Sequence, residues 1–168
     1  MKDNKEIIEK YHEVTSVLIE KKLSISTMES CTGGLIGVLL SDREGASAVV
    51  KGGYFTYTNE QKIACGVPAD VIEQYGVYSK ETACAMATAA RKSTGSDIGI
   101  GVTGSIGTID PNNSDSIPGE VFFAIDMNGN VHNKKMTIAP ASRYDSRYFI
   151  ADDIADILFD LMFLNKSF

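Results

Sequence analysis

The sequence predicts an α/β layered domain with a mixed sheet, and two observations lead to this prediction. β-Favouring runs, such as residues 23–27, are interleaved with segments whose apolar residues recur at helical spacing, which is the pattern of an α/β fold. Asn128-Gly129 separates two further β-favouring runs, 121–126 and 131–138, and this dipeptide is a strong hairpin signal. A hairpin joins antiparallel strands, so the sheet is expected to be mixed.

The individual elements follow from local signals. Helices are expected where apolar spacing follows a capping residue, and strands where β-favouring residues lie between turn signals. In chain order the sequence predicts a helix over the first twenty residues, a strand at 23–27, a helix at 35–40, a strand at 54–57, short helices after Thr58 or Asn59 and from Pro68 to Gly76, a helix from Ser79 to about Thr94, a strand at 97–102, the two hairpin strands, and a last helix capped by Ser142. The long polar loop 103–119 is expected to be functional or mobile.

Length and composition indicate one globular domain spanning residues 1–168, with no second domain. Sixteen basic and 22 acidic residues give a net charge of −6, which argues against nucleic-acid binding as the main task. No apolar run approaches the roughly 18–20 residues that span a bilayer. The N-terminus is charged where a signal peptide would be apolar, so a cytoplasmic protein without membrane association is expected. Three cysteines without metal-type spacing, and only two histidines, predict neither a zinc site nor another metal.

The stretch ESCTGG (29–34) follows the strand 23–27 and precedes a helix, and it carries the first candidate site. Ser30 is expected at the carboxyl edge of the sheet, where α/β proteins usually keep their sites. The free N–H groups of the following helix could stabilise a developing oxyanion. A plain N-cap is the alternative interpretation of Ser30. The P-loop and G-x-S-x-G motifs are absent and the histidines are few, so a nucleophilic serine would need another base, for which lysine is the usual substitute.

YTNEQK (57–62) offers that lysine, because here again a strand is predicted to run into a helix. If Asn59 caps the helix, Lys62 lies in its first turn, where the dipole and partial burial would lower the pKa of its amine. Tyr57, expected as the last residue of the strand, could relay a proton or hydrogen-bond the nucleophile. The alternative is a solvated helix lysine beside a core tyrosine.

Two arginines form a third candidate element near the start of the last helix. Arg143 and Arg147 are four residues apart and therefore share one helix face. The helix dipole does not favour cations at this end, which indicates that they face an anion or a carboxylate. Pairing with Asp145 or another acidic residue remains the alternative.

Together these segments resemble a known family. ESCTGG, the Y-[ST]-N-x-x-K pattern about 25 residues later, and a helix beginning at VYS are similar to the C-terminal domain of competence/damage-inducible protein A, CinA. The resemblance continues through GVTGSIG, GEVFFAI and SRYDSR, from about residue 5 to 165. It implies a three-layer α/β/α sandwich with a mixed, mostly parallel sheet. Stand-alone copies in this family are nicotinamide-nucleotide amidases.

The resemblance implies a hydrolase that converts nicotinamide mononucleotide to nicotinate mononucleotide and ammonia, in pyridine nucleotide salvage, without a metal or cofactor. It makes Ser30 the nucleophile, Lys62 its base and Tyr57 the third catalytic residue. The remaining assignments are to substrate binding: Thr32, Gly33 and Gly34 on the oxyanion side, Asn59 at the turn or ligand, Gly104 and Ser105 in the nucleotide pocket, and Arg143 and Arg147 at the phosphate or another part of the ligand.

The chain also departs from the family pattern. The run 104–110 lacks the usual proline and following glycines, the run 116–121 lacks a lysine, and the usual glycine and aspartate are missing ahead of Arg143. These changes favour, as an alternative function, a weak or inactive paralogue that binds a nucleotide or a protein partner. A cysteine hydrolase using Cys31 is a further alternative. The apolar end, LFDLMFLNKSF (158–168), fits either a homo-oligomer interface or burial in the chain's own core.

Overall fold

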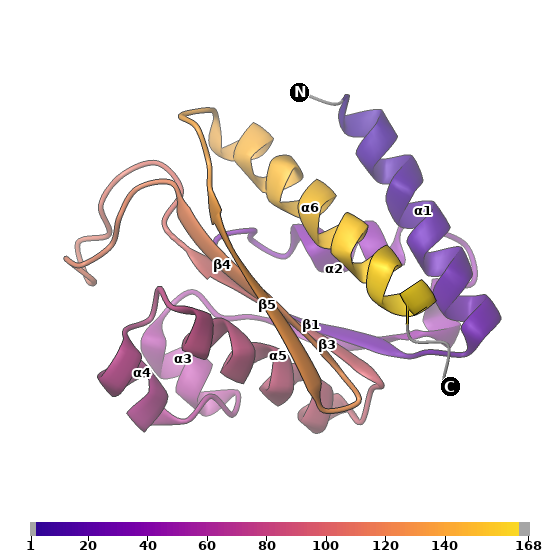
Figure 1. Cartoon of the computed structure of the whole chain (residues 1–168), viewed down its shortest axis with the longest axis horizontal. Helices are drawn as coiled ribbons and strands as arrows, with labels where there is room; N and C mark the ends of the chain where they lie inside the picture. The colour runs from indigo at the N-terminus through magenta and orange to yellow at the C-terminus, as the bar shows by residue number, and fades with distance from the viewer. Residues whose placement is uncertain (1–2, 165–168) are drawn as a thin grey trace.

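The computed structural model describes residues 3–164, which form three layers (Figure 1). A five-stranded sheet lies between helices α1, α2 and α6 on one face and α3, α4 and α5 on the other. The α/β class and the mixed sheet predicted from the sequence are confirmed. Within the described residues, no helix is long and apolar enough to cross a membrane.

The sheet has the strand order β2-β1-β3-β4-β5. Its bounds are β2 (Val50–Phe55), β1 (Ile25–Glu29), β3 (Ile98–Gly104), β4 (Glu120–Met127) and β5 (Asn130–Thr137). Strands β2, β1 and β3 are parallel, whereas β4 is antiparallel to both of its neighbours. Asn128 and Gly129 have φ values of 51° and 95° and form the predicted tight turn between β4 and β5, because both central residues of such a turn need positive φ.

The helices begin where the sequence places their caps. They are α1 (Asn4–Lys21), α2 (Leu35–Ser41), α3 (Asn59–Ala64), α4 (Ala69–Tyr75), α5 (Lys80–Thr94) and α6 (Arg143–Leu164), with a 3-10 turn, η1 (Ala46–Ala48), before β2. The hydroxyls of Thr58 and Ser79 each accept a hydrogen bond from the backbone N–H three residues on. Ser142 accepts in the same way from Asp145. These caps satisfy N–H groups that the first helical turn leaves free.

Several strand boundaries differ from the prediction, and the end of β2 moves a candidate residue. β1 begins at Ile25 and continues to Glu29, β2 begins at Val50 and ends at Phe55, and β3 continues to Gly104. β2 takes in Gly52 and Gly53 because they pair with the buried β1, so tertiary pairing overrides their poor strand propensity. Tyr57 is therefore not the last residue of the strand; it lies in the connection to α3.

Helix α5 packs close to the sheet, because β3 has no side chain at Gly99 and Gly101. A Cβ added at Gly99 would lie 2.1 Å from the Ala87 carbonyl oxygen, and one added at Gly101 would lie 2.3 Å from that of Ala83. The alanine-rich face of α5 and the glycine-diluted β3 thus fit each other. This contact holds α5 against β3, whose last residue, Gly104, lines the cavity described below.

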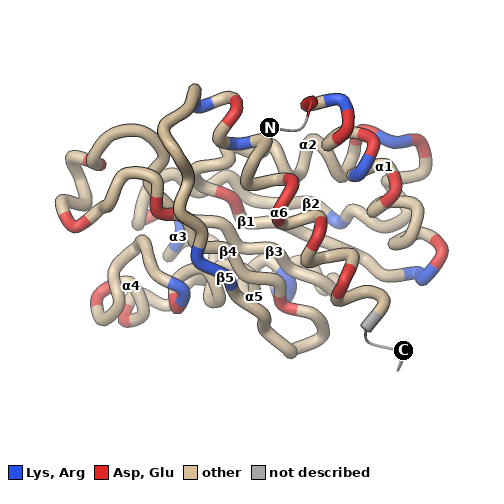
Figure 2. The backbone as a smooth tube through the Cα atoms, turned by 45° about the horizontal axis from the view of Figure 1, so that its top comes forward, with Lys and Arg blue, Asp and Glu red and all other residues tan. Residues whose placement is uncertain are grey.

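The opposite layer packs through its own helices. Both acidic and basic residues occur along α1 (Figure 2), and Lys10 of α1 is paired with Asp152 and Asp156 of α6. Near the end of α6, Leu158, Leu161 and Met162 are buried in the core. Intramolecular packing thus accounts for part of the apolar terminal segment, while residues 165–168 lie outside the described residues. A homo-oligomer stays a prediction.

Candidate active site

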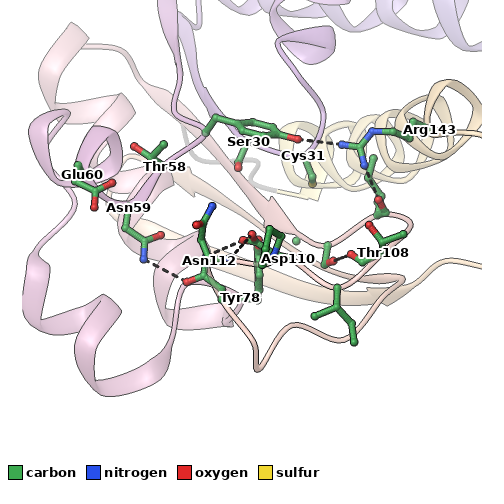
Figure 3. Close-up of a pocket in the computed structure, with 17 residues that line it drawn as sticks. Ser30, Cys31, Thr58, Asn59, Glu60, Tyr78, Thr108, Asp110, Asn112 and Arg143 are labelled. Atoms are coloured by element: carbon green, nitrogen blue, oxygen red, sulfur yellow. Dashed lines mark hydrogen bonds between the residues drawn. The ribbon is translucent and has the colours of Figure 1, made fainter.

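A cavity of about 680 Å³ opens at the carboxyl edge of the parallel strands, above Ser30 and Cys31. Residues following β1, β2 and β3 line it, together with Tyr78 and the start of α6. Figure 3 shows Ser30, Asp110 and Arg143 turned toward this cavity from three different segments. Its volume is in the range of small-molecule sites, and its lining is rich in hydroxyl and amide side chains.

Ser30 lines this cavity, and Lys62 contacts Ser30 from the protein interior, outside the cavity lining. The Lys62 Nζ lies 3.4 Å from the Ser30 Oγ, and it donates a hydrogen bond to the Thr56 carbonyl oxygen at 3.0 Å. Lys62 is only 1% exposed. Burial lowers the pKa of Lys62 from 10.5 to about 8, because a buried ammonium loses its hydration. Near neutral pH a fraction of this amine is therefore neutral and able to accept a proton.

Local sequence explains how Lys62 reaches the serine. Thr58, the first of the two predicted caps, begins α3 with its hydroxyl on the Gln61 N–H. Lys62 then falls on the buried side of this helix. The helix has six residues, too short for a strong dipole, so burial replaces the predicted dipole as the main cause of the lowered pKa.

The turn carrying Ser30 is tight and is supported from α6. The Ser30 N–H donates to the Val102 carbonyl at 3.1 Å, and the Gly33 N–H donates to the Ser30 carbonyl at 3.0 Å. Gly33 has a φ of +66°, and a Cβ there would lie 3.0 Å from the Arg147 Cζ. Arg147 Nε in turn donates to the Cys31 carbonyl at 3.1 Å. Arg147 thus supports the turn that carries Ser30 and does not line the cavity.

Glu29 occupies the N-terminus of α2, whose N–H groups were predicted from the sequence to be free for an oxyanion. Its buried carboxylate accepts hydrogen bonds from the Thr32 hydroxyl at 2.7 Å and from the Ile36 and Gly37 N–H groups at 3.0 and 2.8 Å. The Leu35 N–H donates to the Thr32 carbonyl. The N–H groups in the first turn of α2 therefore already have hydrogen-bond acceptors within the chain. Thr32, Gly33 and Gly34 lie outside the cavity lining. Glu29 was not singled out from the sequence, where its position directly before the candidate nucleophile was the feature that could have indicated it.

Tyr57 and Arg143 contact each other at the cavity. Tyr57 is 58% exposed, and its hydroxyl accepts a hydrogen bond from Arg143 Nη2 at 3.1 Å. Arg143 Nη1 donates to the Ile106 carbonyl at 2.7 Å. Both side chains line the cavity, but the Tyr57 hydroxyl bonds to Arg143 and not to Ser30. Arg143 consequently links α6 to the loop after β3.

The other predicted binding residues also reach the cavity. Asn59, Gly104 and Ser105 line it. The Asn59 amide donates to the Asn113 side-chain oxygen at 3.3 Å, and the Ser105 hydroxyl donates to the Thr108 carbonyl at 2.9 Å. The first bond ties the start of α3 to the long loop 105–119, and the second lies within that loop.

Asp110 and Tyr78 were not singled out from the sequence, although Asp110 lies in the loop expected to be functional. The Tyr78 hydroxyl and the Asn113 amide donate to Asp110 Oδ2 at 2.6 and 2.7 Å. These hydrogen bonds hold the pKa of Asp110 below its ordinary value. Burial, and then the bond to Asp110, raises the pKa of Tyr78 above its ordinary value. Asp110 is thus an ionised carboxylate at the cavity.

Cys31 lies beside Ser30 but in a different environment. It is buried, and that burial together with the nearby Glu29 raises the pKa of its thiol to about 12. The thiolate is the reactive form of cysteine. A thiol that keeps its proton to such a high pH is a poor nucleophile at neutral pH, which disfavours the cysteine-hydrolase alternative.

The CinA C-terminal domain model matches residues 8–157. A CinA-like protein of Gemmatimonas aurantiaca is 37% identical over 139 residues, which cover 82% of this chain and 32% of the relative. The competence/damage inducible protein CihA of Agrobacterium tumefaciens is 30% identical with a TM-score of 0.84, covering 96% of this chain and 97% of that one. A CinA superfamily protein of Escherichia coli is 25% identical with a TM-score of 0.87, covering 96% and 93%.

This chain spans 27% to 34% of the length of the first curated relatives it matches. Its likeness to the two solved structures, in contrast, extends over nearly the whole of both chains. The family model covers most of the described sheet and helices, including every segment that forms the cavity. The chain belongs to the CinA C-terminal domain family.

Proposed function

We propose that this chain is an amidohydrolase that converts nicotinamide mononucleotide to nicotinate mononucleotide and ammonia. The observation that carries the proposal is the Ser30–Lys62 pair, with 3.4 Å between Oγ and Nζ and a lysine whose burial lowers its pKa to about 8. A serine beside a base of this kind is the arrangement of an activated nucleophile. The choice of substrate rests on the family to which the chain belongs.

The reaction is an acyl transfer in two stages. Neutral Lys62 accepts the Ser30 hydroxyl proton as Oγ attacks the carboxamide carbon. The protonated Lys62 then gives that proton to the leaving nitrogen, the C–N bond breaks, and ammonia departs from an acyl-serine ester. Water attacks the ester while Lys62 takes one of its protons, and return of that proton to Ser30 Oγ releases the carboxylate product. A positioned base of this kind typically contributes about 10²–10⁴-fold.

The oxyanion formed in each stage needs donors near Ser30. Since Glu29 occupies the N–H groups of α2, the candidate donor is the backbone N–H of Cys31. Cys31 directly follows the nucleophile and lines the cavity, and the residue after the nucleophile supplies such a donor in other serine hydrolases. Arg143 is the candidate contact for the phosphate, because its guanidinium lies at the cavity and can bind phosphate oxygens.

A second candidate function is a weak or inactive paralogue that binds a nucleotide or a protein partner. The observation that favours it is the run 104–110, where the chain departs from the family pattern and most of whose residues line the cavity. Arg143 is also engaged by the Ile106 carbonyl and the Tyr57 hydroxyl. Such a protein would bind its ligand without releasing ammonia.

The test is ammonia release from nicotinamide mononucleotide by the wild-type protein, Ser30→Ala and Lys62→Ala. An exposed lysine provides a matched control in Lys51→Ala. We expect release by the wild type and the control, and a loss of at least about 100-fold in both site variants. Release that survives Ser30→Ala would remove the proposed nucleophile. No release from folded wild-type protein would favour the binding paralogue.

A further inference from the structure

We infer that Asp110 selects substrates whose aromatic ring carries a positive charge, that is, N-alkylated pyridinium carboxamides, over neutral aromatic amides. This inference deepens the proposed function and rests on it for the identity of the ring. It concerns a residue in the stretch 104–110, where the chain departs from the pattern of its family. It therefore describes this chain rather than the family as a whole.

The Asp110 carboxylate is fixed in place at the cavity. Oδ2 accepts from the Tyr78 hydroxyl and from the Asn113 amide, and Oδ1 accepts from the Asn112 N–H at 2.9 Å. A carboxylate has about four lone-pair sites, so these three bonds hold it without exhausting it. A charged group that is already oriented loses little conformational entropy when a ligand binds.

The less exposed charged groups of the cavity are a carboxylate and a guanidinium that come from different segments. Among the described residues that line it, the charged side chains are Glu60, Asp110 and Arg143. Glu60 is exposed, whereas half-buried Asp110 comes from the loop after β3 and Arg143 from the start of α6 (Figure 3). A carboxylate and a guanidinium on separate segments match a ligand with a cationic and an anionic end. Nicotinamide mononucleotide has both, in its pyridinium ring and its phosphate.

The state of Lys62 during catalysis strengthens this match. Asp110 and Lys62 attract each other, which raises the pKa of Lys62 against the effect of its burial. To act as a base, Lys62 must first lose its proton, and the positive charge facing Asp110 is then lost. A pyridinium ring bound beside Ser30 would restore a positive charge to the cavity at that moment. A neutral ring would leave the carboxylate without one.

The test measures binding, so that it does not depend on turnover. Titration calorimetry compares N1-methylnicotinamide, a cation, with nicotinamide, which is neutral and otherwise similar, on wild type and Asp110→Asn. Asp115→Asn is the matched control, because Asp115 is an exposed aspartate of the same loop that does not line the cavity. We expect the wild type and the control to bind the cation about tenfold more tightly than the neutral amide, and Asp110→Asn to bind both about equally.

Three results would overturn the inference. The first is an unchanged preference for the cation in Asp110→Asn. The second is an equal loss of affinity for both ligands in that variant, which would mean that Asp110 only holds the loop. The third is no measurable binding of the cation to the wild type. Thermal unfolding of each variant verifies that it is folded. Cation preference without ammonia release from nicotinamide mononucleotide would remove the proposed hydrolysis alone. Ammonia release without cation preference would remove this inference alone.

Discussion

The Glu29 carbonyl accepts a hydrogen bond from the Thr56 N–H at 2.8 Å, and this bond relates the candidate nucleophile to its base. Ser30 follows Glu29 in the chain, while the Thr56 carbonyl accepts the hydrogen bond from Lys62 Nζ at 3.0 Å. The ends of the neighbouring strands β1 and β2 thus set the distance between Oγ and Nζ. The Glu29 side chain adds a second restraint by binding the start of α2.

We expect Glu29→Gln to lower kcat about tenfold while leaving KM nearly unchanged. The amide of glutamine cannot accept through its nitrogen, so one N–H of α2 loses its acceptor, at a cost of about 1–3 kcal/mol in unfolding free energy. The turn carrying Ser30 then loses its fixed geometry. Steady-state kinetics and thermal unfolding measure the two effects. Thr32→Val removes one donor to Glu29 and should have a smaller effect, and a stability loss with unchanged kcat would assign Glu29 a purely structural role.

The kcat/KM of the wild type for nicotinamide mononucleotide should rise with pH, with a midpoint near 8. The sign follows from Lys62, whose ammonium must lose its proton before it can accept one from Ser30, and whose pKa burial lowers to about 8. A pH–rate profile of the free enzyme reports this group. A profile that is flat between pH 7 and 9 would argue against Lys62 as the base.

The sequence predicted the features that depend on neighbours in the chain. The caps at Thr58, Ser79 and Ser142 and the turn at Asn128-Gly129 depend on local hydrogen bonds and backbone angles, which residue type specifies. Ser30 and Lys62 came together as expected because both follow adjacent parallel strands.

Features that depend on distant pairing were missed. Tyr57 lies beyond β2 because the last pair between β1 and β2 is Glu29 with Phe55. The contact between Arg147 and the Cys31 carbonyl joins residues 116 positions apart, and no local pattern encodes it. The hydrogen bonds of Glu29 to α2 likewise require the turn after β1 to fold back on itself, which spacing alone does not specify.

Lys62→Met should abolish activity and raise stability at pH 7 by about 1–2 kcal/mol. The ordinary lysine pKa is 10.5, and burial lowers that of Lys62 to about 8. This difference means that the buried ammonium lowers the unfolding free energy of the wild type by about 3 kcal/mol at pH 7. Methionine removes this cost, but it also removes the hydrogen-bond donor to the Thr56 carbonyl, which offsets part of the gain. Because the folded state releases this proton at lower pH than the unfolded chain, wild-type stability should approach that of the variant between pH 8 and 10.5. Denaturant unfolding at pH 7 and pH 10 measures both, and a constant difference would contradict the burial argument.

Gly33→Ala should destabilise the protein more than Gly34→Ala and should also reduce activity. Both glycines have positive φ, +66° and +90°, so alanine is strained at either position by about 1 kcal/mol. A Cβ at Gly33 also meets the Arg147 guanidinium at 3.0 Å, whereas at Gly34 no atom lies within 4 Å. The difference between the two variants in unfolding free energy therefore reports the cost of displacing the Arg147 guanidinium from the turn. Equal losses in both would show that backbone strain alone matters.

Asp110→Asn should move the midpoint of the pH–rate profile below its wild-type value. Asp110 attracts the Lys62 ammonium and so raises its pKa against the larger, lowering effect of burial. An amide at this position removes that attraction, and the lysine releases its proton at lower pH. The base is then more fully deprotonated at neutral pH but weaker. The variant should lose less activity at pH 7 than at pH 9, where the wild-type lysine is already neutral and the substrate contact to Asp110 is the main loss.

Profiles of wild type, Asp110→Asn and Asp115→Asn measured together test this, and a midpoint that moves equally in both variants would point to the net charge of the loop instead of Asp110.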